Sequence, residues 1–101
     1  MVEPFSPAAG VVGERLRGIR TELGLSQEEV AHLAEIHPTN YGKIERGRAN
    51  PSLSTVIRIA TVLDVDAGEL IAGLTISDLP GRHRLYTAKD FLHERDRVRN
   101  P

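Results

Sequence analysis

Five residues near the middle of the chain could contact the edges of nucleic-acid bases. They stand close together at the start of a short segment predicted to be helical, and they are His37, Pro38, Thr39, Asn40 and Lys43. An asparagine amide can offer a paired donor and acceptor to adenine, and a lysine ammonium can donate to the acceptors of guanine. A threonine can form a hydrogen bond or place its methyl group against thymine, whereas a proline offers apolar contact alone. A short helix that carries such groups at its N-terminus fits into the major groove of DNA.

Catalytic chemistry has little support in the sequence. The 101 residues include no cysteine, which excludes disulfides, thiol catalysis and cysteine-ligated zinc. The four histidines are dispersed, and their spacing resembles no zinc site. No nucleophile stands with a base and an orienting group, and no glycine-rich phosphate loop is present. We therefore predict that the chain is not an enzyme and has no catalytic residue, no metal site and no cofactor.

The charge pattern permits a nucleic-acid partner although the total charge does not demand one. The net charge of -1 argues against a non-specific nucleic-acid coat, which would be strongly basic. The charges are segregated, however, because residues 64–78 hold acids and no basic residue, while residues 82–99 are mainly basic. No apolar run approaches the ~20 residues that span a bilayer, and the acidic N-terminus is unlike a signal peptide. We expect a cytoplasmic protein without a membrane partner.

The first elements are an arm and a helix. Residues 1–10 contain two prolines and a glycine and show no apolar period, which predicts a flexible N-terminal arm. From Val12 to Leu23 apolar residues recur at helical spacing, and Gly24 is placed to end this helix. Gly13 and Gly18 each weaken it by about 1 kcal/mol relative to alanine, so tertiary packing must hold it.

The second and third helices follow after short turns. Ser26 and Glu29 have the spacing of a capping box, and the second helix that they begin is predicted to bury Val30, Leu33 and Ala34. The third helix opens at residue 37 with a proline in its first turn, where proline is well tolerated. It turns residues 41 and 44 inward, and the glycine at position 47 closes it.

Two more short helices complete the predicted core. Ser52 caps the fourth helix, whose buried stripe comprises residues 56, 59, 60 and 63. Asp66 caps the fifth, in which Leu70 and Ile71 are expected to face inward. Five short helices with brief connections predict an all-α domain over residues 11–74.

Residues 75–101 form a C-terminal extension of different character. Pro80 and Gly81 indicate a turn, and Thr87 with Asp90 resembles another capped helix start. We predict a sixth helix over residues 88–98. Its apolar residues are few, so this helix needs a surface to pack on.

Three motifs then occur in one order and at fixed spacing. They are R-x-x-R-x-x-x-G-L-S-Q before the second helix, K-I-E-R-G at the end of the third, and N-P-S-L at the start of the fourth. Together they resemble the Cro/C1-type (XRE-like) helix-turn-helix family over residues 12–74. The resemblance implies a five-helix, lambda-repressor-like DNA-binding domain whose third helix enters the major groove.

Site residues carried over from this resemblance fall into two groups. The base-facing candidates are Pro38, Thr39 and Lys43, with His37 and Asn40 beside them; His37 could equally serve only as an N-cap. The candidates for contact with the DNA backbone are Gln27, Arg46, Arg48, Asn50 and Ser52. Such contacts position a domain without reading sequence. For Ser52 the alternative is a cap alone, and for Arg46 an ion pair with an acid.

The resemblance also implies an ion pair between Arg20 and Glu45 that holds the third helix at its angle. Two residues depart from the family pattern. Glu35 stands where glycine is usual, at a turn position that often needs a positive φ, which could cost about 1 kcal/mol. Gly42 lies inside the third helix, where a larger polar residue is more usual.

Two functions follow from these observations. The first is a transcriptional regulator, a repressor, that binds a palindromic DNA operator as a homodimer with half-sites ~34 Å apart. Leu74, Ile76 and Leu79 would form the dimer contact, and the protein would be associated with the nucleoid. The second is an antitoxin or adaptor, a protein-interaction module that uses the same fold and grips a protein partner with residues 75–101.

Overall fold

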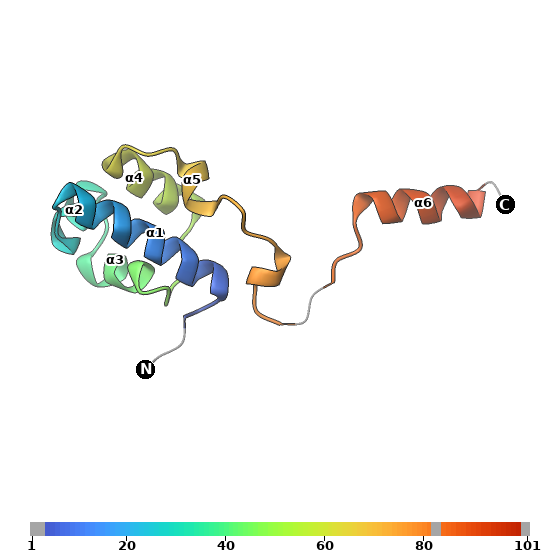
Figure 1. The fold of residues 1–101 in the computed structure, drawn as a ribbon, viewed down its shortest axis with the longest axis horizontal. Helices are drawn as coiled ribbons and strands as arrows, with labels where there is room; N and C mark the ends of the chain where they lie inside the picture. Colours follow the sequence, from blue (N-terminus) through green and yellow to red (C-terminus); the bar gives the residue numbers. More distant parts are fainter. Residues whose placement is uncertain (1–3, 82–83, 100–101) are drawn as a thin grey trace.

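In the described part of the chain, five α-helices pack around one another, and a sixth stands apart from them (Figure 1). The bounds are α1 Pro7–Leu23, α2 Gln27–Leu33, α3 Pro38–Glu45, α4 Leu53–Leu63, α5 Ala67–Ile71 and α6 Ala88–Arg99, with a 3-10 turn η1 at Ile76–Asp78. This computed structural model describes residues 4–81 and 84–99, and those ranges contain helices and turns but no strand. The prediction of an all-α fold with a sixth helix in the extension is confirmed.

The start of α1 differs from the sequence-based expectation. α1 begins at Pro7, so the prediction of a flexible arm over residues 1–10 is wrong for residues 7–10. The Ser6 hydroxyl accepts a hydrogen bond of 3.0 Å from the Ala9 amide, and a proline in the first turn loses no helical hydrogen bond. The Phe5 amide also donates to the Gly47 carbonyl at 2.6 Å, which ties this segment to the end of α3. Residues 1–3 of the predicted arm lie outside the described residues.

The later helices begin where their caps predict. The Ser26 hydroxyl accepts from the Glu29 amide at 3.1 Å while the Glu29 carboxylate accepts from the Ser26 amide at 2.8 Å, so the capping box is present. Ser52 accepts from the Thr55 amide at 3.2 Å at the start of α4. Asp66 caps α5 through the amide of residue 68 at 2.9 Å. These local hydrogen bonds satisfy amides that have no partner within their helices.

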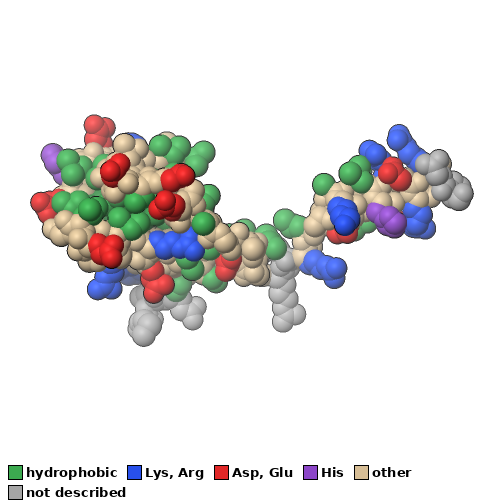
Figure 2. All heavy atoms as spheres, turned by 45° about the horizontal axis from the view of Figure 1, so that its top comes forward, with side chains coloured by type: hydrophobic (Ala, Val, Ile, Leu, Met, Phe, Trp, Pro, Cys, Tyr) green, Lys and Arg blue, Asp and Glu red, His purple; other side chains and the backbone are tan. Residues whose placement is uncertain are grey.

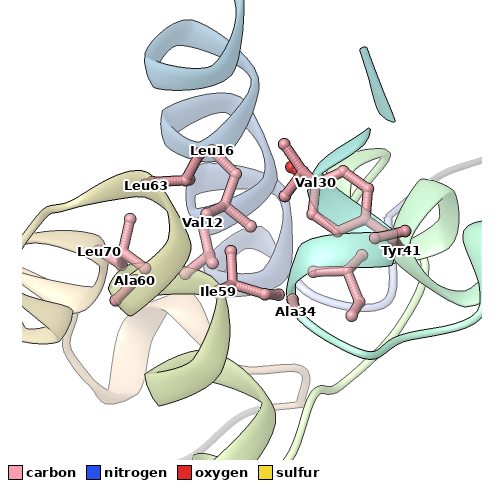
Figure 3. Close-up of a cluster of buried hydrophobic side chains, with 11 residues drawn as sticks. Val12, Leu16, Val30, Ala34, Tyr41, Ile59, Ala60, Leu63 and Leu70 are labelled. Carbon is pink, nitrogen blue, oxygen red and sulfur yellow. The ribbon is translucent and has the colours of Figure 1, made fainter. Parts of the chain in front are cut away.

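All five packed helices contribute to one hydrophobic core (Figure 3). Tyr41 is fully buried within it. The buried side chains are Val12, Leu16, Val30, Ala31, Ala34, Tyr41, Ile44, Ile59, Ala60, Leu63 and Leu70. Because α1 packs on α3 and α5, α2 on α3 and α4, and α4 on α5, the core fixes α3 from two sides.

Two residues predicted to face inward are exposed instead. Leu33 is 59% exposed and Ile71 is 53% exposed. Successive helical residues differ by ~100° around the axis, so α2 buries the arc that holds Val30, Ala31 and Ala34 while Leu33 falls outside it. α5 has a single turn of 5 residues, and its one fully buried residue is Leu70.

Gly13 explains how α1 can lie so close to α3. A Cβ atom at this position would lie 2.3 Å from the carbonyl oxygen of Glu45 and 2.9 Å from that of Ile44. Glycine therefore lets the backbone of α1 cross directly over the end of α3. The residue that lowers the intrinsic helix propensity of α1 is the residue that permits this crossing.

The extension leaves the packed helices after η1 (Figure 1). α6 is exposed along its length, and the Asp90 amide donates to the Thr87 hydroxyl at 3.1 Å at its start. Among residues 4–81 and 84–99, no helix has both the length and the apolar character that a membrane crossing requires.

Candidate nucleic-acid interface

α3 divides its side chains between an inward and an outward face. Tyr41 and Ile44 are buried against the core, whereas Thr39, Asn40 and Lys43 are exposed. Residues three or four positions apart share one face of a helix. Because Tyr41 and Ile44 pack into the core, the remaining residues Thr39, Asn40 and Lys43 point outward. The outward face presents an amide, a hydroxyl and an ammonium group together. These are groups that form hydrogen bonds with base edges.

His37 caps the start of α3. Its Nδ1 atom accepts a hydrogen bond from the Thr39 amide at 3.1 Å, and Pro38 occupies the first position of the helix. Both side chains are exposed at the end of the same outward face. The imidazole uses one ring nitrogen for the cap, and the other nitrogen takes no part in that bond.

A network of hydrogen bonds joins α1 and α2 to the last residue of α3. Arg20 donates to both carboxylate oxygens of Glu45, from Nε at 2.8 Å and from Nη2 at 2.6 Å, and it also donates to the Leu25 carbonyl at 2.8 Å. Gln27 donates from Nε2 to the same carboxylate at 3.1 Å. This is the ion pair that the resemblance implied, with a glutamine added. It holds α3 against α1 by a bidentate contact.

The buried position of this network shifts the ionisation of its members. Burial alone would raise the pKa of Glu45, but the hydrogen bonds from Arg20 and Gln27 lower that pKa below its usual value. The hydrogen bond to Glu45 raises the pKa of Arg20. Burial, and then the neighbouring carboxylate, raise the pKa of the Tyr41 hydroxyl, so that group stays neutral. At neutral pH the site therefore holds one fixed, paired carboxylate.

One hollow lies between α3 and α4. It has a volume of about 300 Å³, and its lining includes His37, Asn40 and Lys43 together with Thr55 and Arg58 of α4. Arg58 donates from Nη2 to the Thr55 hydroxyl at 3.5 Å. Arg58 is therefore a second cation, besides Lys43, next to the outward face of α3.

A second hollow lies between α3 and the first two helices. It has a volume of about 320 Å³ and is lined by Glu14, Arg17, Arg20, Gln27, Glu45 and Arg46. A Cβ atom at Gly42 would lie 3.0 Å from Nη1 of Arg46 and 3.4 Å from Oε1 of Gln27. The glycine therefore leaves room for the Arg46 guanidinium to lie along α3 beside Gln27.

Known proteins resemble this chain in sequence and fold. A family model described as helix-turn-helix matches residues 16–70, which is more than half of the chain. The chain belongs to the helix-turn-helix family. Its members of the Cro/C1 type are the transcriptional regulators whose motifs the sequence contains.

Three similar proteins show the range of this family. The SPbeta prophage-derived HTH-type transcriptional regulator YonR of Bacillus subtilis is 39% identical over 61 residues, which cover 60% of this chain and 56% of the relative. The crystal structure of the restriction-modification controller protein C.AhdI from Aeromonas hydrophila is 42% identical, covers 61% of this chain and 94% of that one, and has a TM-score of 0.60. The crystal structure of SinR, a master regulator for biofilm formation, in complex with DNA is 33% identical, covers 58% of this chain and 95% of that one, and has a TM-score of 0.56.

These likenesses show the kind of domain that the chain contains. It has a helix-turn-helix DNA-binding fold, and the proteins that it resembles are transcriptional regulators, repressors and controller proteins. The chain spans 56% of the length of YonR and 94% of the length of C.AhdI.

Within this helix-turn-helix protein, the loop from α3 to α4 carries the other backbone-contact candidates. Arg48, Asn50 and Ser52 are all exposed there. The Ser52 hydroxyl is engaged as the cap of α4. Neither Arg46 nor Arg48 forms an ion pair within the described ranges, so the alternative in which Arg46 only pairs with an acid is not observed there.

The turn between α2 and α3 shows the departure from the family pattern. Glu35 has a φ of 59°, so the expected left-handed conformation is present without the usual glycine. Its side chain lines the hollow that contains Arg58. The turn therefore adds an acid to a surface that otherwise gathers cations.

Sequence reasoning missed Arg17, Thr55 and Arg58 as candidates. Arg17 was noted only within a motif, and its position across a hollow from Arg46 depends on how α1 crosses α3. Thr55 and Arg58 lie on the solvent side of α4, three residues apart, where a polar residue ordinarily has no partner beyond water. No local pattern could have indicated that they face α3.

Proposed function

We propose that this protein is a transcriptional repressor that binds a palindromic DNA operator as a homodimer, with α3 in the major groove of each half-site. The observation that carries the proposal is the outward face of α3, which is rich in hydrogen-bonding groups and flanked on both sides by arginine-lined hollows. A helix that presents such groups between cations matches a groove that runs between two phosphate backbones.

The base contacts come from α3. Asn40 bonds an adenine through its amide, Lys43 donates to guanine O6 and N7, and Thr39 contacts thymine or a base edge. His37 and Pro38 lie at the helix end and contact the neighbouring base pair. The support is their shared exposure on the face opposite Tyr41.

The backbone contacts come from both sides of α3. Gln27 and Arg46 hold a phosphate at one hollow, and the missing side chain at Gly42 leaves room for both of them. Arg48, Asn50 and Ser52 hold the backbone at the following loop. Arg17 and Arg58 extend these two surfaces, since each lines one of the hollows.

Two copies bind together on half-sites ~34 Å apart, in the manner of dimeric helix-turn-helix regulators. Leu74, Ile76 and Leu79 supply the contact between the copies, supported by the exposure of Leu79 next to η1. The protein acts at the nucleoid in the cytoplasm, where such operators are found.

A second function has one observation in its favour. α6 exposes Phe91, Leu92 and Val98 to solvent, which suits an antitoxin or adaptor that grips a protein partner with its extension. Antitoxins and repressors both bind operators, so the α3 contacts proposed above serve either role.

Mobility-shift titrations with substituted proteins test the DNA assignment. Thr39→Ala and Lys43→Ala should each cost about 1–3 kcal/mol at the preferred sequence and relax the preference at one base pair. Arg48→Ala should weaken binding to all sequences alike and lower the slope of log affinity against log salt by about 1. Unchanged affinity and preference in both α3 variants would contradict the proposal.

A further inference from the structure

An apolar groove lies on the surface formed by the start of α1, the loop from α3 to α4, α5 and the segment after α5. It has a volume of about 210 Å³, and its lining includes Phe5, Val12, Ile71, Leu74 and Leu79. Phe5, Ile71 and Leu79 are large apolar side chains that are each about half exposed, at 56%, 53% and 46%. Contiguous apolar surface of this kind is ordinarily covered by a partner.

α6 is a short helix whose apolar side chains are exposed and, among the described residues, not packed against another surface. Phe91 and Val98 are seven residues apart and lie on one side of the helix, with Leu92 beside Phe91, and all three are exposed. A helix of 12 residues is marginal in water unless an apolar face is packed against something. Figure 1 shows α6 projecting away from the other helices.

The segment around α5 and α6 itself carry opposite charge. Residues 64–78, which supply Ile71 and Leu74 to the groove, carry Asp64, Asp66, Glu69 and Asp78 and no basic residue, although none of these acids lines the groove itself. α6 carries four basic residues against three acidic ones, and its ion pairs Arg97–Glu94 and Arg95–Asp96 engage two of those acids. In Figure 2 acidic side chains are spread over the visible face of the packed helices, whereas basic side chains predominate on α6.

We propose that α6 of one copy docks in the groove of a second copy, and that the second copy returns its own α6 to the first. The apolar side of α6 then covers Phe5, Ile71 and Leu79, and its basic residues face the acids of residues 64–78. This inference rests on the homodimer of the proposed function and names the contact that forms it. A reciprocal exchange is closed by one two-fold axis, so each groove and each helix is used once.

The course of the chain favours a second copy over the chain's own groove. Leu79 lines the groove, and the chain turns at Pro80 and Gly81, where Gly81 has a φ of 94°. α6 lies beyond the edge of the packed helices (Figure 1). A direct pairing of two α6 helices would instead leave both grooves open and bring the arginines of two basic segments together.

The sequence lacks cysteine, which allows a disulfide test with the full chain. Ile71→Cys in a tagged chain and Leu92→Cys in an untagged chain are mixed, oxidised mildly and separated without reductant. A disulfide between the two different chains is expected. Leu53→Cys, at a residue that is 73% exposed on α4 and outside the groove, replaces Ile71→Cys as the matched control and should give no such product.

Three results would overturn the proposal. One is a disulfide that joins Leu92→Cys only to itself, which would indicate pairing of two α6 helices. Another is a product with the Leu53→Cys chain in place of the Ile71→Cys chain. The third is a disulfide that stays within one chain when Ile71→Cys and Leu92→Cys are combined, since α6 would then occupy its own groove.

A charge placed on α6 separates this contact from DNA recognition. Leu92→Asp should convert a dimer into a monomer in light scattering while the helix content of the packed helices, measured by circular dichroism, is retained, because α6 lies outside their core. Leu53→Asp should remain a dimer. The monomeric variant should still prefer the same half-site sequence at higher protein concentration. A dimeric Leu92→Asp protein would refute the α6 contact alone, whereas loss of sequence preference in the unsubstituted chain would refute the proposed function.

Discussion

Glu45 is a carboxylate at the end of α3 that the fold removes from water and surrounds with donors. Arg20 binds both of its oxygens and Gln27 binds one, so three helices meet at a single side chain. A buried charge of this kind is costly unless it is paired. The pair therefore fixes the angle of α3 more than it adds to total stability.

The lowered pKa of Glu45 gives this pair a pH dependence. The folded protein binds the Glu45 proton less readily than the unfolded chain does, so the stabilisation is complete above the ordinary glutamate pKa and is lost as pH falls through the lowered value. Glu45→Gln should reduce the free energy of unfolding by about 2 kcal/mol at neutral pH. The difference from the unsubstituted protein should shrink in acid.

Urea unfolding at a series of pH values measures this effect. Glu22→Gln, at an exposed position in the last turn of α1, is the matched control and should change stability by less than about 0.5 kcal/mol. A Glu45→Gln deficit that stays constant from neutral to acid pH would contradict the pairing.

At the scale of the elements, the crossing of α1 over α3 sets the position of the outward face. Gly13→Ala would push a methyl group to 2.3 Å from a backbone oxygen of α3, so the two helices must move apart. We expect a loss of about 3 kcal/mol in the free energy of unfolding and weaker DNA binding, because α3 shifts.

Gly18→Ala is the natural control in the same helix. A Cβ atom there has no neighbour within 4 Å, so the substitution should stabilise the protein by about 1 kcal/mol through helix propensity alone. Chemical denaturation of both variants measures their free energies of unfolding and so tests whether α1 lies this close to α3. Equal stability of Gly13→Ala and Gly18→Ala would show that the close approach is absent.

The turn before α3 offers a separate test. Glu35 is held at a positive φ, so Glu35→Gly should stabilise the protein by about 1 kcal/mol. It also removes an acid from the hollow beside Arg58, which should raise DNA affinity at low salt. Glu35→Ala removes the same charge but keeps the strained backbone, so it should raise affinity without the gain in stability. A gain of stability in both variants would assign the effect to charge instead.

Sequence analysis correctly predicted the helices whose starts are determined by nearby capping residues. The N-caps lie within a few residues of the helices that they begin, so their spacing predicts the starts of α2, α4, α5 and α6. The start of α1 carried the same kind of signal in Ser6 and Pro7, but Ala8, Ala9 and Gly10 supply no apolar period, and the segment was predicted to be an arm. Leu33 and Ile71 were misplaced because a helix of 7 or 5 residues is too short for periodicity to fix its buried face.

The hollows beside α3 could not be predicted, for a different reason. Arg17 lines the same hollow as Arg46, and Arg58 lines the same hollow as His37, only because the packing of the helices brings parts of α1 and α4 beside α3. Those arrangements depend on tertiary packing, including the missing side chain at Gly13. The outward residues of α3, in contrast, follow from two inward positions in one short helix.

The whole molecule has a nearly neutral total charge, but its positive and negative charges lie on separate surfaces. Cations flank the outward face of α3, acids gather on residues 64–78, and α6 is mainly basic. In the proposed complex, this division directs one face to DNA phosphates and another face to a second copy. A regulator with this layout can bind a defined operator without the strong positive charge of a non-specific coat.

Selection of bound sites from a random DNA pool tests the central claim most directly. The unsubstituted chain should enrich a two-fold symmetric motif whose half-sites lie about one helical turn apart, ~34 Å. The Thr39→Ala, Lys43→Ala double variant should keep that spacing and lose preference at bases within each half-site. No enriched motif, or a motif that the double variant leaves unchanged, would contradict recognition of DNA through α3.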